Sequence, residues 1–449
     1  MAQKSIVKYS DILKAKRFDA EYFKPEYLEY DLNIEKKGYW VLNEISDVLG
    51  GKRLPLNENF VDEGVPYIRA EDIKNSFIDY ENVPKISLEL HKKLINYQTK
   101  KDDILLTIVG NSIGDVGIVK FEIDKCNLTE NAAKITNIEL INPETLFCFL
   151  LSKYGQNQIH REKVGTAQPK LALERIRRFK IPLFSQSFQL EIKNIVKTAY
   201  KKQILAKKFY KEAERILLKE LDLVDYKPKH RLAFTTTKKE VENTKRFDAE
   251  YFQPKYEEIL EKIENYYGGY DTLGNVIKIK DENFIPKKGE KYKYIALANV
   301  SNFGYIQSYE ENFGENLPTR ARRKINTGDV IVSSIEGSLN SCALIEKEFD
   351  NSICSTGFYV LNSEKINSET LLILVKSLPL QMQLKRGCKG TILTAIPKDE
   401  LKKIKIPLIN PIVQQQISQK INQSHLLRKE SKELLEEAKR KVEEEIDKG

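Results

Sequence analysis

The sequence predicts an α+β protein in which two tandem, pseudo-twofold-related domains are joined by two long antiparallel coiled-coil helices. An eleven-residue block occurs at Arg17–Tyr27 and again at Arg246–Tyr256, with nine of its eleven positions identical. Short β-branched runs separated by Gly, Asn and Pro follow each block, as is typical of strands between turns. A long polar-apolar segment with no internal Gly or Pro then closes each half, which predicts a helix.

The repeat extends over the whole of each half. The two blocks lie 246 − 17 = 229 residues apart, and a later pair of glycines lies 390 − 165 = 225 residues apart. Other segments match between these limits and in the same order: Tyr67–Ile73 with Tyr294–Val300, Asp103–Thr107 with Asp329–Ser333, and Lys180–Leu183 with Lys405–Leu408. An offset that drifts by so little indicates duplication of an entire domain together with the element that follows it.

Four segments follow from this pattern. We expect a first domain with its N-terminal block at 1–184 and a central long helix at 185–222. A linker, the second block and the second domain occupy 223–409, and a C-terminal long helix occupies 410–449. Within the domains, alternating or β-branched runs predict strands at Ile104–Val109, Val116–Val119 and Val330–Val332.

Composition sets broad limits on the function. The 449 residues are 41% hydrophobic and 31% charged, as in globular proteins, and the net charge of +9 is compatible with a nucleic-acid partner. No apolar run approaches the roughly 20 residues that a membrane span needs, and the polar Met1–Ser10 segment lacks a signal core. We therefore expect a cytoplasmic protein without membrane contact. The five cysteines form no CxxC pair, so we expect buried or spare thiols.

Each predicted helix has a start signal and a contact face. Ser185 and Asn410 stand at equivalent N-cap positions, and Pro411 suits a first helical turn. Roughly 35 residues at 1.5 Å each give helices of about 50 Å. A 3-4 spacing predicts the helix seam: Ile192, Val196, Ala199, Gln203, Ala206, Tyr210, Ala213 and Leu217 in the first helix, and Ile417, Ile421, Ser424, Arg428, Ser431, Leu435, Ala438 and Val442 in the second. Small residues recur every seven positions, which allows close approach of two backbones. The alternative is that each helix covers only its own domain.

The order of these features resembles the specificity subunit of type I restriction-modification systems. The resemblance rests on the two blocks, the Tyr67–Ile73 segment, the Gly328–Val330 and Ser355–Phe358 segments, and the two strand-helix units. It implies a DNA-binding subunit that reads one half of a bipartite, asymmetric site with each domain, while the helices set the spacer. It also implies recruitment of two methyltransferase subunits and, in some members, of two endonuclease/translocase subunits, with the adenine-specific methylation and the cleavage performed by those partners.

The motifs of catalysis are not found in the sequence. The Asn142-Pro143-Glu144 and Asn410-Pro411-Ile412 segments do not fit the loop with which amino-methyltransferases hold a base, and there is no phosphate loop for ATP. His91, His160, His230 and His425 lack metal-ligand spacing and a nucleophile partner. We therefore expect no catalytic residues, no metal and no cofactor.

Candidate DNA contacts are basic or amide side chains in loops. In a duplicated reader the scaffold should match between copies while base-reading positions differ. For the first domain we expect contacts from Lys52, Arg53, Arg69, Asn111, Ser112, Lys163 and Lys170; for the second, from Lys287, Lys288, Arg320, Arg322, Arg323, Ser338, Asn340 and Lys389. Lysines are expected on phosphates, and Arg and Asn are better suited to bases.

Several of these assignments have a structural alternative. Tyr67 and Tyr294 match and are interpreted as core residues rather than base-stacking groups. Arg69 faces Ala296 in the other copy, so it could offer a bidentate contact to guanine or form an ion pair with Glu71 or Asp72. The Arg320–Arg323 cluster could equally be ordinary solvated charge.

Two questions remain open at the level of sequence. The blocks, with aromatics such as Phe18, Tyr22 and Phe23, either stabilise the junction of helix and domain or dock a methyltransferase subunit, and core positions are favoured for these aromatics. The rival function is a two-domain nucleic-acid-binding scaffold, for example one that binds RNA, without a modification partner. A restriction enzyme with fused catalytic function is disfavoured by the missing motifs.

Overall fold

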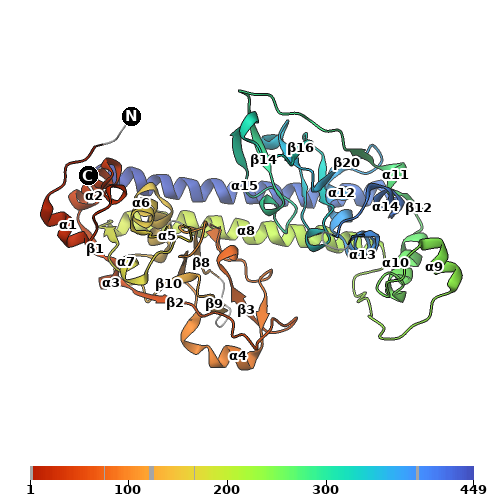
Figure 1. Cartoon of the computed structure of the whole chain (residues 1–449), viewed down its shortest axis with the longest axis horizontal. Helices are drawn as coiled ribbons and strands as arrows, with labels where there is room; N and C mark the ends of the chain where they lie inside the picture. Colours follow the sequence, from red (N-terminus) through yellow and green to blue (C-terminus); the bar gives the residue numbers. More distant parts are fainter. Residues whose placement is uncertain (1–3, 75, 121–125, 166, 391–393) are drawn as a thin grey trace. The chain divides into compact units, whose positions relative to one another are not determined.

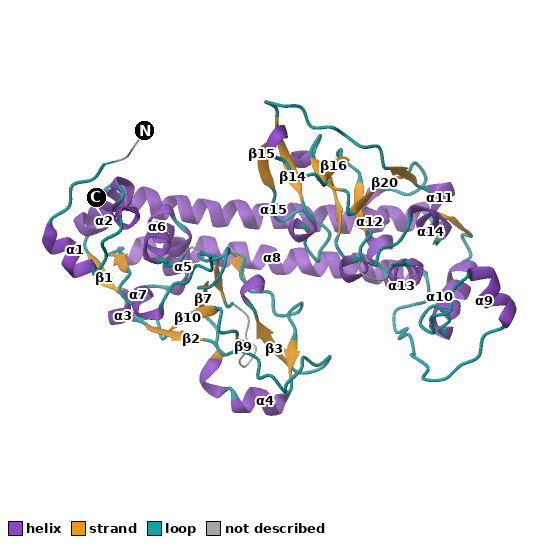
Figure 2. Ribbon diagram, in the orientation of Figure 1, coloured by secondary structure: helices purple, strands orange, loops and turns teal. Residues whose placement is uncertain are grey.

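The computed structural model describes residues 4–74, 76–120, 126–165, 167–390 and 394–449 (Figure 1). The chain forms two compact units: the first unit comprises Met1–Gln203 and Lys429–Gly449, and the second unit comprises Ile204–Arg428. Two long helices, α8 (Gln186–Glu220) and α15 (Pro411–Asp447), each contribute one stretch to both units. Helices and sheets are mixed in each unit (Figure 2), which confirms the α+β prediction.

The first unit contains seven further helices and eleven strands among its described residues. The helices are α1 (Tyr9–Ala15), α2 (Pro25–Lys37), α3 (Leu42–Ile45), α4 (Leu88–Lys93), α5 (Pro143–Leu151), α6 (Lys153–Glu162) and α7 (Leu173–Ile176). The strands are β1 (Tyr39–Val41), β2 (Asp47–Gly50), β3 (Val65–Ile68), β4 (Ser76–Phe77), β5 (Lys85–Ile86), β6 (Gln98–Thr99), β7 (Ile104–Thr107), β8 (Val116–Ile118), β9 (Cys126–Leu128), β10 (Ala132–Thr136) and β11 (Lys180–Pro182).

The second unit is built in the same order. Its helices are α9 (Lys238–Thr244), α10 (Pro254–Glu264), α11 (Leu273–Val276), α12 (Ser368–Lys376), α13 (Leu378–Gly387) and α14 (Lys398–Lys403). Its strands are β12 (Tyr270–Thr272), β13 (Lys278–Lys280), β14 (Lys291–Ile295), β15 (Glu310–Phe313), β16 (Ala321–Lys324), β17 (Val330–Ser333), β18 (Cys342–Leu344), β19 (Ile353–Ser355), β20 (Phe358–Asn362) and β21 (Lys405–Pro407).

Sheet topology repeats between the units. One sheet has the order β2-β10-β7-β8-β4 in the first unit and β13-β20-β17-β18 in the second. A second sheet has the order β5-β3-β9-β6 in the first unit and β15-β14-β19-β16 in the second, with the β3/β9 and β14/β19 pairs parallel. Strands β7 and β17 are buried along their whole length because Ile, Leu and Val fill both faces of these central positions. The strands predicted from the β-branched runs are therefore confirmed.

Stretches of the long helices belong to the core of each unit. In the first unit Val196 of α8 and Ala438 of α15 lie in one apolar cluster with Leu106 of β7 and Phe147 of α5. In the second unit the corresponding cluster combines Leu217 of α8 and Ile421 of α15 with strand and α12 side chains. The predicted seam residues are buried, except Gln203 and Arg428, which are half-buried. Each helix therefore packs both on its own domain and on the other helix, so the two alternatives drawn from the sequence are not exclusive.

The two helices run antiparallel within each unit. In the first unit, Lys441 pairs with Glu191 at 2.7 Å, and Ser431 donates a 2.7 Å hydrogen bond to the carbonyl oxygen of Ala199. In the second unit the contacts are between Ser424 and the carbonyl oxygen of Ala206 at 2.7 Å, and between Lys420 and Glu212 at 2.7 Å. The residue numbers rise on one helix as they fall on the other, which confirms the predicted direction.

Helix ends match their sequence signals. The Ser185 hydroxyl accepts a hydrogen bond from the backbone N–H of Phe188 at 3.2 Å, and the Asn410 side chain accepts one from Ile412 at 2.9 Å. Helix α8 ends in a Schellman motif, because Asp222 adopts φ +53° and the N–H of Leu223 reaches the carbonyl of Leu218 at 2.7 Å. Side-chain N-caps contribute about 1 kcal/mol each to helix stability.

Candidate nucleic-acid interface

A pair of loops, one after β7 and one after α6, gathers four of the predicted contacts in the first unit. The turn after β7 is joined to the loop after α6, because Gly110 N–H donates to the Pro169 carbonyl at 3.1 Å. Val164 and Lys170 exchange two backbone hydrogen bonds, of 2.9 and 2.8 Å, at the base of the second loop. We call residues 109–113 together with the described residues of 163–171 the first loop pair.

Exposed polar side chains extend from the first loop pair. Asn111, Ser112, Lys163 and Lys170 are all exposed. Within the described part of the chain, their side chains make no hydrogen bond or ion pair. Amide and hydroxyl groups on a turn, flanked by two free ammonium groups, match the combination of base-edge and phosphate contacts found in DNA readers.

The second unit repeats this backbone arrangement. Glu336 N–H donates to the Thr394 carbonyl at 3.0 Å, and Lys389 exchanges hydrogen bonds of 2.8 and 3.1 Å with Ala395. We call residues 334–341 together with the described residues of 388–396 the second loop pair. Gly165 and Gly390 occupy equivalent positions with φ of +94° and +130°, which explains why both copies retain glycine there.

The side chains of the second loop pair are arranged differently. The half-buried Ser338 hydroxyl lies 2.9 Å from that of Ser333, and Lys389 forms an ion pair with Glu400 at 3.1 Å. Asn340 is exposed, and its backbone carbonyl accepts a hydrogen bond from Lys376 at 2.9 Å. The two loop pairs thus present different polar groups on one common frame.

The loop after β2 lies against the end of β9. A Cβ atom at Gly51 would lie 2.0 Å from the carbonyl oxygen of Thr129, so only glycine permits this approach. The N–H of Lys52 donates to Leu128 at 2.8 Å, and the guanidinium of Arg53 pairs with Glu130 at 2.6 Å. The Arg53 side chain is nevertheless 77% exposed, so Lys52 and Arg53 stand on a rigid backbone with accessible cationic groups.

Arg69 is engaged within its own segment. Its guanidinium pairs with Glu71 and with Asp72, the latter at 3.1 Å. These contacts correspond to the ion-pair alternative drawn from the sequence. To contact a DNA base, the Arg69 side chain, which is 38% exposed, would have to release Glu71 and Asp72. Tyr67 and Tyr294 are 3% and 5% exposed, which confirms their assignment to the core.

In the second unit, the arginine cluster lies beside the lysine-bearing loop. Phe284 N–H donates to the carbonyl of Arg322 at 2.8 Å, and Arg323 donates to the side chain of Asn283 at 2.8 Å. Two segments far apart in the sequence, 281–288 and 320–324, are thereby brought together.

The three arginines of this cluster differ in availability. Arg323 is held by Asn283 and by the backbone of Asp281, and the Arg322 Nε donates to the carbonyl of Thr319 at 3.1 Å. Arg320 is exposed, and the described residues offer its side chain no hydrogen bond or ion pair. Lys287 and Lys288 are also exposed, with Glu290 3.5 Å from the Lys287 ammonium. Arg320 and Lys288 are therefore exposed cations of this surface whose side chains have no hydrogen bond or ion pair among the described residues.

The repeated block has a buried side and an exposed side. Arg17 forms two hydrogen bonds to Asp19, of 2.6 and 2.9 Å, and the hydrogen bond from Arg17 lowers the pKa of that carboxyl. Tyr22 and Phe23 are buried, but Phe18 is 80% exposed. Its counterpart Phe247 is 88% exposed. The expectation of a core position was therefore wrong for Phe18, because the Arg17–Asp19 pair turns the chain so that this ring points to solvent.

Two arginines that hold the blocks were missed in the sequence. Arg161 of α6 lies 4.2 Å from the ring centre of Tyr22, and Arg386 of α13 lies 4.7 Å from that of Tyr251. Each also donates to a backbone carbonyl of its block, at 2.8 and 3.0 Å. The two arginines lie 386 − 161 = 225 residues apart, and that shared offset was the signal that could have identified them.

Neither a metal site nor a membrane span is found in the part of the chain that the structure describes. No group of three or more His, Cys, Asp or Glu side chains there could hold a metal ion. No described helix is long and apolar enough to cross a bilayer. The five cysteines are free and buried, as expected.

A comparison with protein families finds a match for part of the chain. Residues 37–215 match the family described as "Type I restriction modification DNA specificity domain". This segment is a type I specificity domain. The match covers strands β1 to β11, the first loop pair and most of α8. It confirms the resemblance to specificity subunits of type I systems that the repeated motifs indicated.

Two curated proteins are similar to parts of this chain. The EcoBI specificity subunit of Escherichia coli is 32% identical over 133 residues, which are 29% of this chain and 28% of that protein. The MjaVIII specificity subunit of Methanocaldococcus jannaschii is 27% identical over 147 residues, which are 32% of this chain and 34% of that protein. The chain thus spans about a third or less of these curated relatives.

Solved structures of specificity subunits are similar over more of the chain. A type I restriction-modification S subunit from M. genitalium aligns over 90% of this chain and 95% of its own, at 13% identity and a TM-score of 0.39. The HsdS subunit from Thermoanaerobacter tengcongensis aligns over 90% and 95%, at 16% identity and a TM-score of 0.30.

Proposed function

We propose that this chain is the DNA-recognition subunit of a type I restriction-modification complex and is itself not a catalyst. Its two target recognition domains, at 1–184 and 223–409, would each read one half of a bipartite, asymmetric duplex site. The spacer helices, at 185–222 and 410–449, would fix the separation of the two half-sites. The match to a type I DNA specificity domain supports this assignment.

The observation that carries the proposal is the repetition of the loop pair. Both units use the same backbone hydrogen bonds to hold a turn against a glycine-containing loop. The exposed side chains on this frame differ, with free Asn111 and Ser112 in one unit and an inward-turned Ser338 in the other. A duplicated frame with different polar groups is what recognition of two unlike half-sites requires.

Nearby cations would supply affinity. Lys163 and Lys170 flank the first loop pair, and Arg320 with Lys288 extends the charged surface in the second unit. We assign them to phosphates, whose contacts position a protein on DNA without reading its sequence. Helices of about 50 Å are compatible with half-sites on the order of one helical turn apart, which the two domains would read in successive major grooves.

The partners follow from the duplication of the blocks. Two nearly identical blocks, each with an exposed phenylalanine, provide two equivalent docking sites for two methyltransferase subunits. Two endonuclease/translocase subunits would complete a restriction complex, and the assembly would act in the cytoplasm. The adenine methylation and the DNA cleavage would lie in these partners.

Selection from a random duplex library tests the function. The full chain, co-purified with its methyltransferase partner, is expected to enrich two unlike conserved blocks separated by a spacer of fixed length. Methylome sequencing of cells with and without the chain should return the same site. Enrichment of single-stranded RNA, with no duplex consensus, would instead support the two-domain scaffold without a modification partner.

A further inference from the structure

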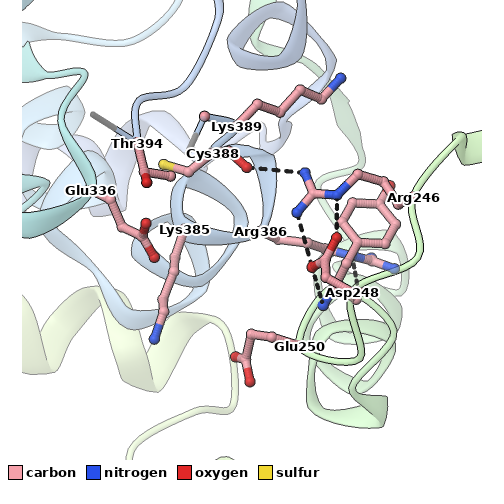
Figure 3. A pocket seen from close by; sticks show the side chains of 11 residues that line it. Arg246, Asp248, Glu250, Glu336, Lys385, Arg386, Cys388, Lys389 and Thr394 are labelled. Carbon is pink, nitrogen blue, oxygen red and sulfur yellow. Dashed lines mark hydrogen bonds and ion pairs between the residues drawn. The ribbon is translucent and has the colours of Figure 1, made fainter. Parts of the chain in front are cut away.

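The second repeated block contacts the chain at the base of the second loop pair. The Nη1 of Arg246 donates a 3.0 Å hydrogen bond to the carbonyl oxygen of Cys388 (Figure 3). Cys388 is the C-cap of α13 and directly precedes Lys389, where the glycine-containing loop begins. A residue outside the recognition loops thus holds the backbone from which one of them departs.

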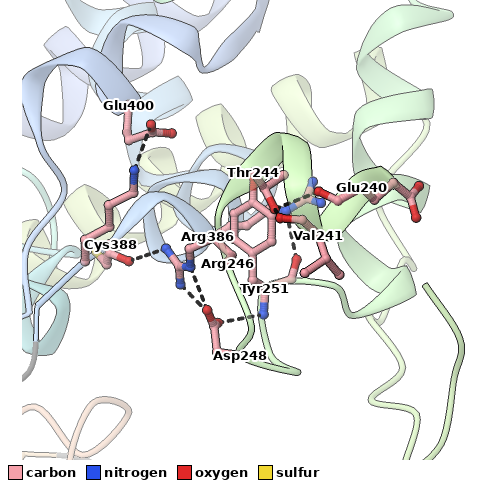
Figure 4. A network of polar contacts seen from close by, with 10 residues as sticks. Glu240, Val241, Thr244, Arg246, Asp248, Tyr251, Arg386, Cys388 and Glu400 are labelled. Carbon is pink, nitrogen blue, oxygen red and sulfur yellow. Dashed lines mark hydrogen bonds and ion pairs between the residues drawn. The ribbon is translucent and has the colours of Figure 1, made fainter. Parts of the chain in front are cut away.

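The Arg246 guanidinium is itself fixed in place. Asp248 accepts two hydrogen bonds from Arg246, of 2.6 and 3.0 Å, and also one from the N–H of Tyr251 at 3.1 Å (Figure 4). The guanidinium also lies over the Tyr251 ring, 4.7 Å from its centre. Because Asp248 and the Tyr251 ring already orient the guanidinium, the hydrogen bond to Cys388 costs little further side-chain entropy.

The held carbonyl lies at the edge of a small ladder. Lys389 and Ala395 exchange two backbone hydrogen bonds, and Ala395 forms a bridge with Ile335 in the turn after β17. On its far side, Ile396 N–H donates to Ser334 at 2.8 Å. The Cys388 carbonyl therefore stands at one edge of a three-segment ladder that sets where both loops of the second loop pair emerge.

In the first unit, the repeated block contacts the equivalent helix end through a different residue. Tyr22, the counterpart of Tyr251, donates to Glu162 at 2.7 Å, and Glu162 is the last residue of α6. Glu162 also accepts from Arg175 at 2.8 Å. By contrast, the Nη1 of Arg17 is buried and has no hydrogen-bond partner among the residues that the structure describes. In both units the block contacts the C-terminal end of the helix that precedes the glycine-containing loop, α6 in the first unit and α13 in the second. Among the described residues, the block arginine makes this contact only in the second unit, where it is Arg246.

From these contacts we propose that Arg246 is a positioning residue for DNA specificity: it fixes the backbone at Lys389 and Ala395, at the base of the second loop pair, and so sets the second half-site without touching DNA. The inference rests on the proposed function. It assigns the block a role in DNA recognition in addition to partner docking. Arg17 and Arg246 occupy equivalent positions in the two blocks, but we predict that only removal of Arg246 changes the base preferences.

The surroundings of Arg246 make it suitable for substitution. Its side chain borders an open cavity of about 480 Å³ between the block, α13 and the loop (Figure 3). Removing the guanidinium would enlarge this open space rather than leave a closed void in the core. The Arg246→Ala chain is therefore expected to fold, and Arg246→Lys gives a milder variant that keeps the charge but not the forked geometry.

The test compares half-sites in one molecule. Wild type, Arg246→Ala, Arg246→Lys and Arg17→Ala are each put through random duplex selection in complex with the methyltransferase partner. For Arg246→Ala we expect the base preferences of one half-site to weaken by roughly tenfold, the effect of losing one charge-assisted hydrogen bond, while the other half-site keeps its preferences. Arg17→Ala should leave both half-sites sharp. Asn243→Ala, at an exposed position of α9 three residues before Arg246, is the matched control.

Hydrogen exchange separates positioning from general destabilisation. The amides of Lys389 and Ala395 should exchange faster in Arg246→Ala, while amides of β17 keep their wild-type rates. If wild type selects a bipartite site and Arg246→Ala selects it with equally sharp half-sites, the positioning role is wrong. Uniform loss of preference in both half-sites would also overturn it. If wild type selects no bipartite site, the proposed function itself fails.

Discussion

The hydroxyl of Ser424 on α15 donates a 2.7 Å hydrogen bond to the backbone carbonyl oxygen of Ala206 on α8. Both residues are fully buried. The same geometry recurs between Ser431 and Ala199 at 2.7 Å in the first unit. Small side chains on both helices bring the backbones close enough for a serine hydroxyl to reach across, which a larger residue on either side would prevent.

Substitutions at this contact should destabilise the second unit. Ser424→Ala removes the hydrogen bond and is expected to cost about 1 kcal/mol of unfolding free energy. Ala206→Leu forces the helices apart and should cost about 1–3 kcal/mol. Chemical denaturation of the purified chain measures both, with Gln423→Ala on the exposed side of α15 as the control. Equal stability of Ala206→Leu and wild type would contradict the close packing.

Removing Arg320 should change how DNA binding depends on salt. Arg320→Ala is expected to weaken binding to all sequences alike and to lower the slope of log affinity against log salt by about 0.9, because one phosphate contact is lost. Arg322→Ala should act in the same direction. Filter-binding titrations at several salt concentrations measure the slope, and Arg231→Ala, which removes an exposed cation paired with Glu258, is the control. A slope unchanged by Arg320→Ala would remove this residue from the interface.

Helix length should set the spacer of the recognised site. Insertion of one seven-residue repeat into both α8 and α15 lengthens the pair by about 10 Å, or roughly three base pairs. Methylome sequencing should then show a longer spacer with unchanged half-sites. Inserting the repeat into one helix alone is the control, since it breaks the register of the seam and should abolish methylation. Altered half-sites with the original spacer would refute the proposal that helix length sets the spacer.

The exposed phenylalanines should govern partner binding. Phe18→Ser is expected to weaken one methyltransferase docking event by roughly thirtyfold, as loss of an aromatic anchor at an interface does. Phe247→Ser should weaken the other, and the double variant should bind neither subunit. Native mass spectrometry reports the stoichiometry, with Leu232→Ser as a control at another exposed apolar position. Retention of two subunits by the double variant would leave the blocks without a docking role.

Acid should remove the contribution of Asp248. The hydrogen bond from Arg246 lowers the pKa of Asp248 below its ordinary value of 3.8 in the folded chain. The stabilisation is therefore complete above the unfolded pKa and is lost as the pH falls through the folded pKa. The difference in unfolding free energy between wild type and Asp248→Asn should be constant above about pH 5 and should shrink below about pH 4. A difference that grows on acidification would reverse the assigned sign.

Features with a regular period or a repeated offset were predictable from the sequence. Helix starts at Ser185 and Asn410, the seam, and strands such as β7 each follow from local patterns that the tertiary structure keeps. Burial of Tyr67 and Tyr294 followed from their matched positions among apolar neighbours.

Contacts between distant segments were not predictable in this way. The Arg428 guanidinium occupies a seam position but lies 3.9 Å from the ring centre of Tyr305, and His425 on the same helix pairs with Glu346 at 3.2 Å. Neither Tyr305 nor Glu346 carries a periodic signal. Phe18 was misassigned for a related reason, because identity between copies marks a shared constraint without indicating whether that constraint is a core or a surface.

The first unit is formed by two segments from opposite ends of the chain, which affects how the chain folds during synthesis. Leu435, Val442 and Ile446 of α15 complete the same apolar cluster as Ile192 and Val196 of α8. Residues 429–449 leave the ribosome only after the whole of 204–428, which takes on the order of tens of seconds at 5–20 residues per second. During that interval the apolar side chains of the first domain that α15 later covers stay exposed, and transiently exposed apolar surface favours aggregation.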